Sequence, residues 1–104
     1  MLELTPDQLA TVRRILAAHA PGREVRVFGS RATGRARPHS DLDLLILGAP
    51  LDAAVRSDLI AAFEESDLPF RVDIIHWQEA PAAMLARIER EAEPLVCCPA
   101  NNWH

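Results

Sequence analysis

Lysine is absent from this sequence of 104 residues, so its eleven basic side chains are all arginine. Acidic residues outnumber them, and a net charge of −4 argues against the general basic surface of a nucleic-acid-binding protein. No apolar run approaches the ~20 residues that span a bilayer. The N-terminus has no basic region followed by an apolar stretch and a cleavage site. We therefore expect a cytoplasmic protein with no membrane association and no direct nucleic-acid binding.

Cysteine is nearly absent as well. Cys97 and Cys98 are adjacent, so a disulfide between them would be strained and would close no useful loop. As metal ligands they lack a second pair at ligand spacing. We expect two free thiols with no part in the chemistry.

We expect a single domain that spans residues 1–104. Its apolar content of 49% suits a globular core, and its length leaves no room for a second one. The periodicity predicts helix, strand, small helix, strand, helix, strand and helix, followed by an irregular tail at 94–104. This order is typical of an α+β fold with α/β-type layering, in which helices pack on one small sheet.

The first helix has clear boundaries. Thr5 is the expected N-cap, Pro6 takes the first helical position, and Gln8 completes a capping box. Pro21-Gly22 ends the helix. Its predicted buried face comprises Leu9, Val12, Ile15, Leu16 and His19.

The later elements are separated by turn residues. Strands are predicted at Val25–Phe28, Asp41–Leu47 and Phe70–Trp77, and helices begin after Asp52 and at Pro81. The inward positions of these two helices are Val55, Leu59, Ile60 and Phe63 in the first, and Met84, Leu85, Ile88 and Ala92 in the second.

A turn at Gly29-Ser30 follows the first strand. Ser30 is expected to cap a short helical turn through Thr33, which Gly34 terminates. Such a turn aims several backbone N–H groups at one spot and so forms an anion site.

Three arginines gather in the same loop. Arg31, Arg35 and Arg37 lie within seven residues on an otherwise acidic chain. A local positive loop suits a compact polyanion such as a nucleoside triphosphate, because guanidinium groups bind phosphate oxygens well. The alternative is a solvated loop whose arginines bind nothing specific.

Three aspartates mark the following strands. Asp41 and Asp43 are two residues apart and therefore point to one face, while Asp73 interrupts the apolar strand Phe70–Trp77. If the two strands are neighbours, the three carboxylates meet, and magnesium would offset their repulsion. Two such ions ~3.5–4 Å apart can activate a hydroxyl and stabilise pyrophosphate. Asp73 would then accept the hydroxyl proton. The alternative is that Asp41 caps a turn and Asp73 pairs with an arginine.

A P-loop is excluded. Residues 29–36 match the spacing of its glycines, but that motif requires Lys and Ser or Thr where this chain has Arg35 and Ala36.

The motif Gly29-Ser30, ten residues, then Asp41-Leu42-Asp43 resembles the Gly-Ser-x10-Asp-x-Asp signature of the polymerase-β-like nucleotidyltransferases. The surrounding Gly-Ser-Arg-Ala-Thr-Gly-Arg-Ala-Arg-Pro-x-Ser-Asp-Leu-Asp-Leu is similar to the minimal nucleotidyltransferase (MNT) branch. The resemblance extends from the first helix to about Leu95.

This resemblance implies a small mixed sheet flanked by helices, with ATP or another triphosphate as donor and two magnesium ions. It implies that Asp41, Asp43 and Asp73 are the catalytic metal ligands. The turn at Gly29-Ser30 would hold the triphosphate, and we expect Arg31 and Arg35 to assist it.

Many minimal members of the family resemble antitoxins paired with a HEPN-type ribonuclease toxin, whose tyrosine hydroxyl they modify with AMP. We therefore expect magnesium-dependent transfer of AMP from ATP to a hydroxyl of a partner HEPN toxin. The chain ends about eleven residues after its last predicted helix, without the acceptor-binding domain of larger relatives, which favours a protein acceptor.

Two alternatives stay open. The chain could be a non-enzymatic antitoxin that occludes its partner, with Leu95, Val96 and Trp103 as a docking segment, or it could modify a small hydroxylated molecule. His39 and His76 are expected to be structural.

Overall fold

A four-stranded sheet with strand order β3-β2-β1-β4 forms the centre of the protein. The computed structural model describes residues 3–37 and 40–96. The strands are β1 (Val25–Phe28), β2 (Leu42–Ile46), β3 (Val72–His76) and β4 (Glu93–Val96). The helices are α1 (Pro6–His19), α2 (Ser30–Thr33), α3 (Ala53–Glu64) and α4 (Ala82–Glu91), with a 3-10 turn, η1, at Trp77–Glu79.

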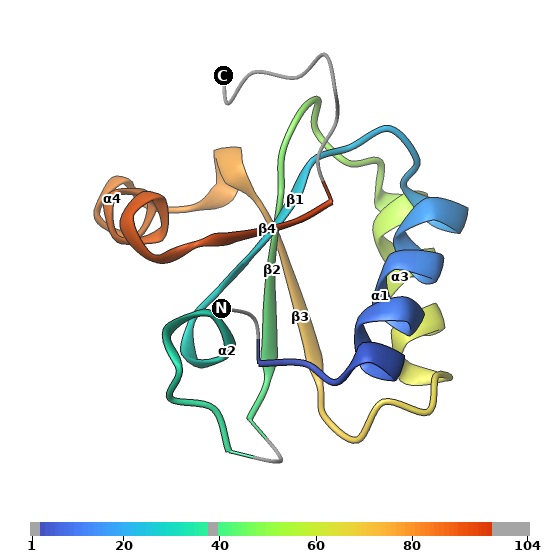
Figure 1. The fold of residues 1–104 in the computed structure, drawn as a ribbon. Coiled ribbons are helices and arrows are strands. Elements are labelled where there is room, and N and C mark those ends of the chain that lie inside the picture. Colours follow the sequence, from blue (N-terminus) through green and yellow to red (C-terminus); the bar gives the residue numbers. More distant parts are fainter. Residues whose placement is uncertain (1–2, 38–39, 97–104) are drawn as a thin grey trace.

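The sheet is mixed, as expected. β1 pairs antiparallel with β2 and with β4, whereas β2 and β3 are parallel and are connected through α3. Helices α1 and α3 cover one face of the sheet, and α2 and α4 lie on the other (Figure 1). This α+β architecture confirms the predicted fold class. No helix in residues 3–37 and 40–96 is long and apolar enough to cross a membrane.

Each face of the sheet has its own core. The larger core, under α1 and α3, includes Leu44 and Ile46 of β2. The smaller core joins Leu45 and Leu47 to Ile88 of α4. Strand β2 therefore contributes to both cores by strict alternation, which accounts for its nearly continuous apolar sequence.

The start of α1 is as the sequence predicts. Thr5 is the N-cap: its Oγ1 accepts a hydrogen bond from the Gln8 backbone N–H (3.1 Å), and its own N–H donates to Gln8 Oε1 (3.0 Å). His19 does not belong to the buried face, although it is the helix-end residue that its position before Pro21-Gly22 predicts. The helix ends there with His19 exposed, and Ala20 takes the next buried position.

Two apolar residues predicted to face inward are exposed instead. Ile60 is 41% exposed because it lies over a hollow beside β3, an edge strand with no further strand to cover it. Met84 is 39% exposed. The smaller core is narrow, so α4 buries only Ile88.

The ends of the two outer strands also differ from the prediction. Strand β3 stops at His76, whose Nδ1 accepts a hydrogen bond from Gln78 N and so turns Trp77 into η1. The predicted irregular tail from residue 94 is wrong for its first residues, because β4 pairs with β1. Cys97, Cys98 and Trp103 lie outside the described residues.

Candidate active site

The parallel register of β2 and β3 places Asp43 directly opposite Asp73. Neighbouring strands are ~4.8 Å apart, so the two carboxylates share one stretch of the sheet. Both residues lie on the face of α2 and α4, because their strand neighbours belong to the other core: Leu42 and Leu44 beside Asp43, and Val72 and Ile74 beside Asp73. Asp41 precedes β2 and is exposed. The structure thus places Asp43 and Asp73 side by side, and Asp41 lies near enough for its charge to act on Asp43.

Asp43 has the least favourable environment for a negative charge among the three aspartates. Its pKa is raised from 3.8 to about 6, first by burial and then by the negative charges of Asp73 and Asp41. Among the residues that the structure describes, no side chain donates a hydrogen bond or forms an ion pair with Asp43. A half-buried carboxylate of this kind favours binding of a proton or of a cation.

Asp73 pairs with Arg71, an arginine that no motif of the sequence singles out. Arg71 Nε lies 3.5 Å from Asp73 Oδ1, and the two side chains are 77% and 47% exposed. An ion pair this exposed contributes little. Asp73 therefore pairs with an arginine, as the alternative proposed, and still lies opposite Asp43. The spacing could have indicated Arg71, since it is two residues before Asp73 in extended chain.

Gly29 brings the Gly-Ser turn against this cluster. It occupies the N-cap position of α2 with φ of 76° and ψ of −155°, a conformation open to glycine almost alone. A Cβ built at Gly29 would overlap Asp43 Oδ2 and lie 3.4 Å from its Cγ. Ser30 is therefore the first residue of α2 and not its cap, which corrects the prediction. Gly34 ends α2 in the left-handed conformation, as expected.

The two arginines predicted to assist the triphosphate differ in their surroundings. Arg31 is 5% exposed, burial lowers its pKa, and its guanidinium donates to backbone carbonyls. These contacts favour a structural role over a phosphate contact. Arg35 is exposed, and within residues 3–37 and 40–96 only its backbone N–H forms a hydrogen bond, 3.0 Å to Ser30 O. Its side chain is available to an anion beside the turn.

His76 has a structural role, as expected. It is 2% exposed, and its Nε2 is 2.9 Å from Gly48 O. It lies at the opposite end of β3 from Asp73. His39 lies outside the described residues.

Magnesium fits the donor set of this cluster. Over residues 3–37 and 40–96, no three acidic, histidine or cysteine side chains converge closely enough to form a complete metal centre. The pKa of Asp43 is nevertheless raised, first by burial and then by the charges of Asp73 and Asp41, and a cation would offset both effects. Magnesium prefers oxygen ligands and is typically held by one or two carboxylates together with substrate phosphates. Asp41 and Asp43 would supply the two carboxylates of such an arrangement.

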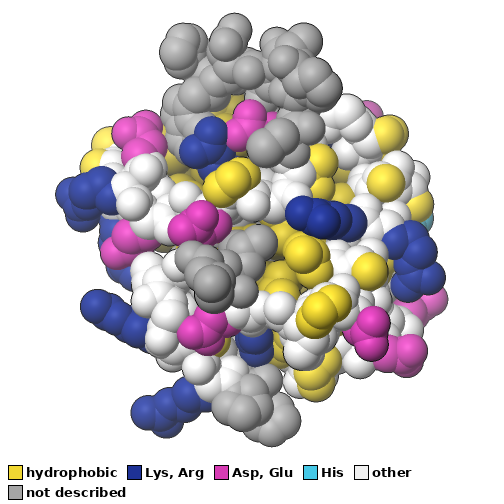
Figure 2. Space-filling view, in the orientation of Figure 1, with side chains coloured by type: hydrophobic (Ala, Val, Ile, Leu, Met, Phe, Trp, Pro, Cys, Tyr) yellow, Lys and Arg dark blue, Asp and Glu magenta, His cyan; other side chains and the backbone are white. Residues whose placement is uncertain are grey.

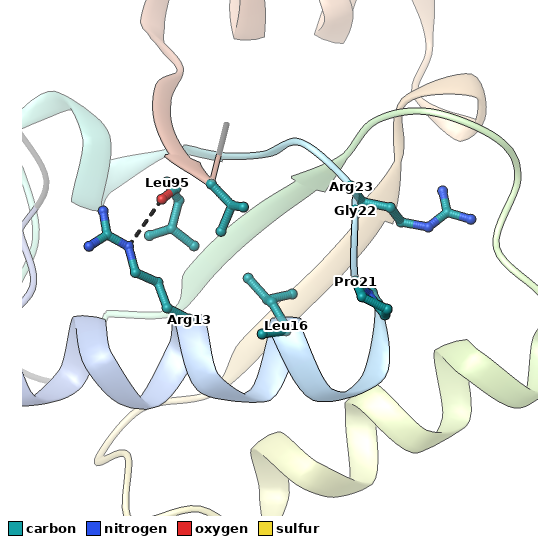
Figure 3. Close-up of a pocket in the computed structure, with 9 residues that line it drawn as sticks. Arg13, Leu16, Pro21, Gly22, Arg23 and Leu95 are labelled. Atoms are coloured by element: carbon teal, nitrogen blue, oxygen red, sulfur yellow. Dashed lines mark hydrogen bonds between the residues drawn. The ribbon is translucent and has the colours of Figure 1, made fainter. Parts of the chain in front are cut away.

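Two hollows lie near the sheet edges. One, of about 490 Å³, runs along β3, and Asp73 and Arg71 form part of its wall. The other, of about 460 Å³, separates α1 from β4, where Arg13 Nε donates to Leu95 O at 3.2 Å (Figure 3). The surface between α1 and β4 is largely apolar (Figure 2). No carboxylate among the described residues lines this second hollow, so it is not part of the aspartate cluster.

Comparison with known proteins identifies the family. Residues 11–100 match the family described as polymerase beta, nucleotidyltransferase. The chain therefore belongs to this family, which confirms the resemblance seen in its motif.

A protein adenylyltransferase is among the proteins that the chain resembles. The chain is 47% identical over 77 residues to the "Probable protein adenylyltransferase MntA" of Haemophilus influenzae, covering 73% of this chain and 68% of that protein. It is thus an enzyme of the nucleotidyltransferase class, homologous to MntA.

Solved structures share the fold. A structure described as a minimal nucleotidyltransferase is 33% identical with a TM-score of 0.68, covering 88% of this chain and 97% of the other. A toxin–antitoxin structure with AMP-PNP has a TM-score of 0.70 at 23% identity, covering 85% and 72% of the two chains.

Substitution of Gly29 by alanine tests the contact between the turn and the cluster. Gly22 is the matched control, because it has the same φ of 76° but no atom within 4 Å of a built Cβ. We expect Gly29→Ala to lower the free energy of unfolding by about 1–3 kcal/mol, and by more than Gly22→Ala, in urea titrations. Only Gly29→Ala should also abolish stabilisation by magnesium and ATP. Equal losses for the two variants would contradict the contact.

The raised pKa of Asp43 predicts a pH-dependent effect of Asp43→Asn. Folding favours the protonated carboxyl, so this contribution to stability is complete below pH 3.8 and is lost as the pH rises through about 6. Without divalent metal, Asp43→Asn should therefore raise the midpoint of thermal unfolding at neutral pH and much less at pH 4. Asp58→Asn, on the exposed side of α3, should show no such trend. Destabilisation by Asp43→Asn at neutral pH would refute the assignment.

Proposed function

We propose that this protein is a magnesium-dependent nucleotidyltransferase that transfers AMP from ATP to a hydroxyl of a partner protein. The observation that carries the proposal is the meeting of two contacts at Asp43: Asp73 lies opposite it, and the Gly29 turn lies against it. In the Gly-Ser-x10-Asp-x-Asp family, such a site combines phosphate-binding backbone with carboxylates. Homology to an MntA protein adenylyltransferase supports a protein as acceptor.

Each group of the site has a role in this reaction. Backbone N–H groups of the turn at Gly29-Ser30, with Arg35, would bind the triphosphate. Asp41 and Asp43 would hold magnesium, which supplies positive charge beside the phosphates when bound. The acceptor oxygen attacks the α-phosphorus, the bond to pyrophosphate breaks, and the hydroxyl proton passes to Asp73.

The position of Asp73 suits a large acceptor. It lies on an edge strand, and its side chain is 47% exposed. A hydroxyl on another protein can therefore approach it from solvent. The weak pairing with Arg71 leaves a carboxylate oxygen of Asp73 available to accept the proton.

The partner that we propose is a HEPN-type toxin. One similar solved structure is described as a tri-AMPylated Shewanella oneidensis HEPN toxin in complex with an MNT antitoxin, with a TM-score of 0.63 and 20% identity. At that identity the likeness concerns the fold. The name of the homologue, MntA, is also that of one component in a solved structure described as the toxin-antitoxin MntA-HepT, which supports an antitoxin role.

The test is incubation with α-labelled ATP, magnesium and the HEPN protein encoded beside this gene. Wild type and Asp58→Asn should label the partner, whereas Asp73→Asn should slow labelling by about 100-fold or more. Measuring toxin activity in parallel separates the mechanisms. Neutralisation by Asp73→Asn without labelling would instead identify a non-enzymatic antitoxin, and labelling of a small molecule only would identify a different acceptor.

A further inference from the structure

Arg31 occupies the point where the segments of the candidate site meet. Its guanidinium donates to the backbone carbonyls of Glu3 (2.8 Å), Ser40 (3.0 Å) and Arg37 (3.3 Å). Its own backbone carbonyl accepts from Glu3 N at 2.8 Å. One side chain thus ties the start of α1, the loop before β2 and helix α2 together.

A fourth segment packs on the same group. The ring of Phe70 lies 4.0 Å from the guanidinium carbon of Arg31, in cation–π geometry. Phe70 is 8% exposed and precedes Arg71, whose carbonyl accepts from Leu42 N at 2.8 Å. The start of β3 is therefore joined both to Arg31 and to the start of β2.

These segments carry the residues of the proposed reaction. Ser40 is followed by Asp41, Phe70 leads to Asp73, and Arg31 itself follows Ser30. We propose that Arg31 is a positioning residue that holds the Asp41 segment in register with the Gly-Ser turn and with Asp73. The inference rests on the proposed function for its catalytic consequence and on contacts within the chain for its structural part.

The chemistry of arginine is required for this arrangement. A guanidinium presents five N–H donors in one plane and leaves its face free to stack on a ring, so it can reach three carbonyls and Phe70 together. A lysine ammonium keeps the charge but is a point donor without a stacking face. Arg31→Lys is therefore expected to loosen the loop before β2 while preserving charge.

The chain offers a matched control at the other end of the sheet. Arg23 precedes β1, and its guanidinium donates to the carbonyls of Leu47 (3.3 Å), Ala49 and Pro50 (3.4 Å), which follow β2. It therefore also fixes a loop through three carbonyls. Since β1 and β2 are antiparallel, this loop lies at the opposite end of the two strands from Gly29 and Asp43.

The experiment compares Arg31→Lys with Arg23→Lys in the full chain. Without nucleotide, amide hydrogen exchange at Glu3 and Leu42 should be about tenfold faster in Arg31→Lys, and unchanged in Arg23→Lys. AMP transfer to the partner should fall about 100-fold in Arg31→Lys, with a higher magnesium concentration needed for half-maximal rate. Phe70→Leu keeps an apolar side chain and removes only the ring, so it should give a smaller change of the same kind.

The outcomes separate this inference from the proposed function. Unchanged exchange at Glu3 and Leu42 in both Arg31→Lys and Phe70→Leu would overturn the inference, as would equal loss of transfer in Arg31→Lys and Arg23→Lys. If wild type transfers no AMP but exchange distinguishes Arg31→Lys from Arg23→Lys, the proposed function is wrong and the positioning of the loop by Arg31 stands.

Discussion

The structure depends on the register in which β2 and β3 pair. That register sets Asp43 opposite Asp73, so two carboxylates of like charge are held together by strands whose apolar residues are buried in β2 and half-buried in β3. A slip of one residue would move every side chain of β2 to the other face and place carboxylates in the main core. The apolar pattern thus enforces a half-buried carboxylate beside other negative charges; burial first, and then repulsion by Asp73 and Asp41, raises the pKa of Asp43, and a bound cation can offset both effects.

One face of the sheet holds the main apolar core, and the other face holds the candidate site. The face under α1 and α3 holds the larger core, which supplies most of the apolar burial. The opposite face is closed near α4 by a small core around Ile88, and its other end carries the aspartates beside α2 (Figure 1). An unfavourable cluster of charges is tolerable because the larger core lies on the other side and does not depend on it. Strained or repulsive groups of this kind are typical of functional sites.

Local signals predicted much of the fold and pointed to several residues of the candidate site. The capping box at Thr5, the glycine turn and the spacing of Asp41 and Asp43 act within a few residues, so the sequence alone exposes them. Packing between segments that are distant in sequence could not be predicted from local patterns. Strand β4 has only four residues, one of them proline, and exists because β1 offers an open edge. The role of Arg31 depends on carbonyls distant in sequence, and no local pattern distinguishes it from the exposed Arg35.

The central claim is that a divalent cation and a triphosphate bind where the Gly-Ser turn meets the aspartates. Manganese can replace magnesium as a paramagnetic probe, and its effect on backbone amide resonances falls off steeply with distance. With a non-hydrolysable ATP analogue present, the account predicts that amides of Gly29, Ser30, Asp43 and Asp73 broaden at the lowest manganese concentrations. Broadening centred on the hollow between α1 and β4, or spread evenly over the acidic surface, would contradict it.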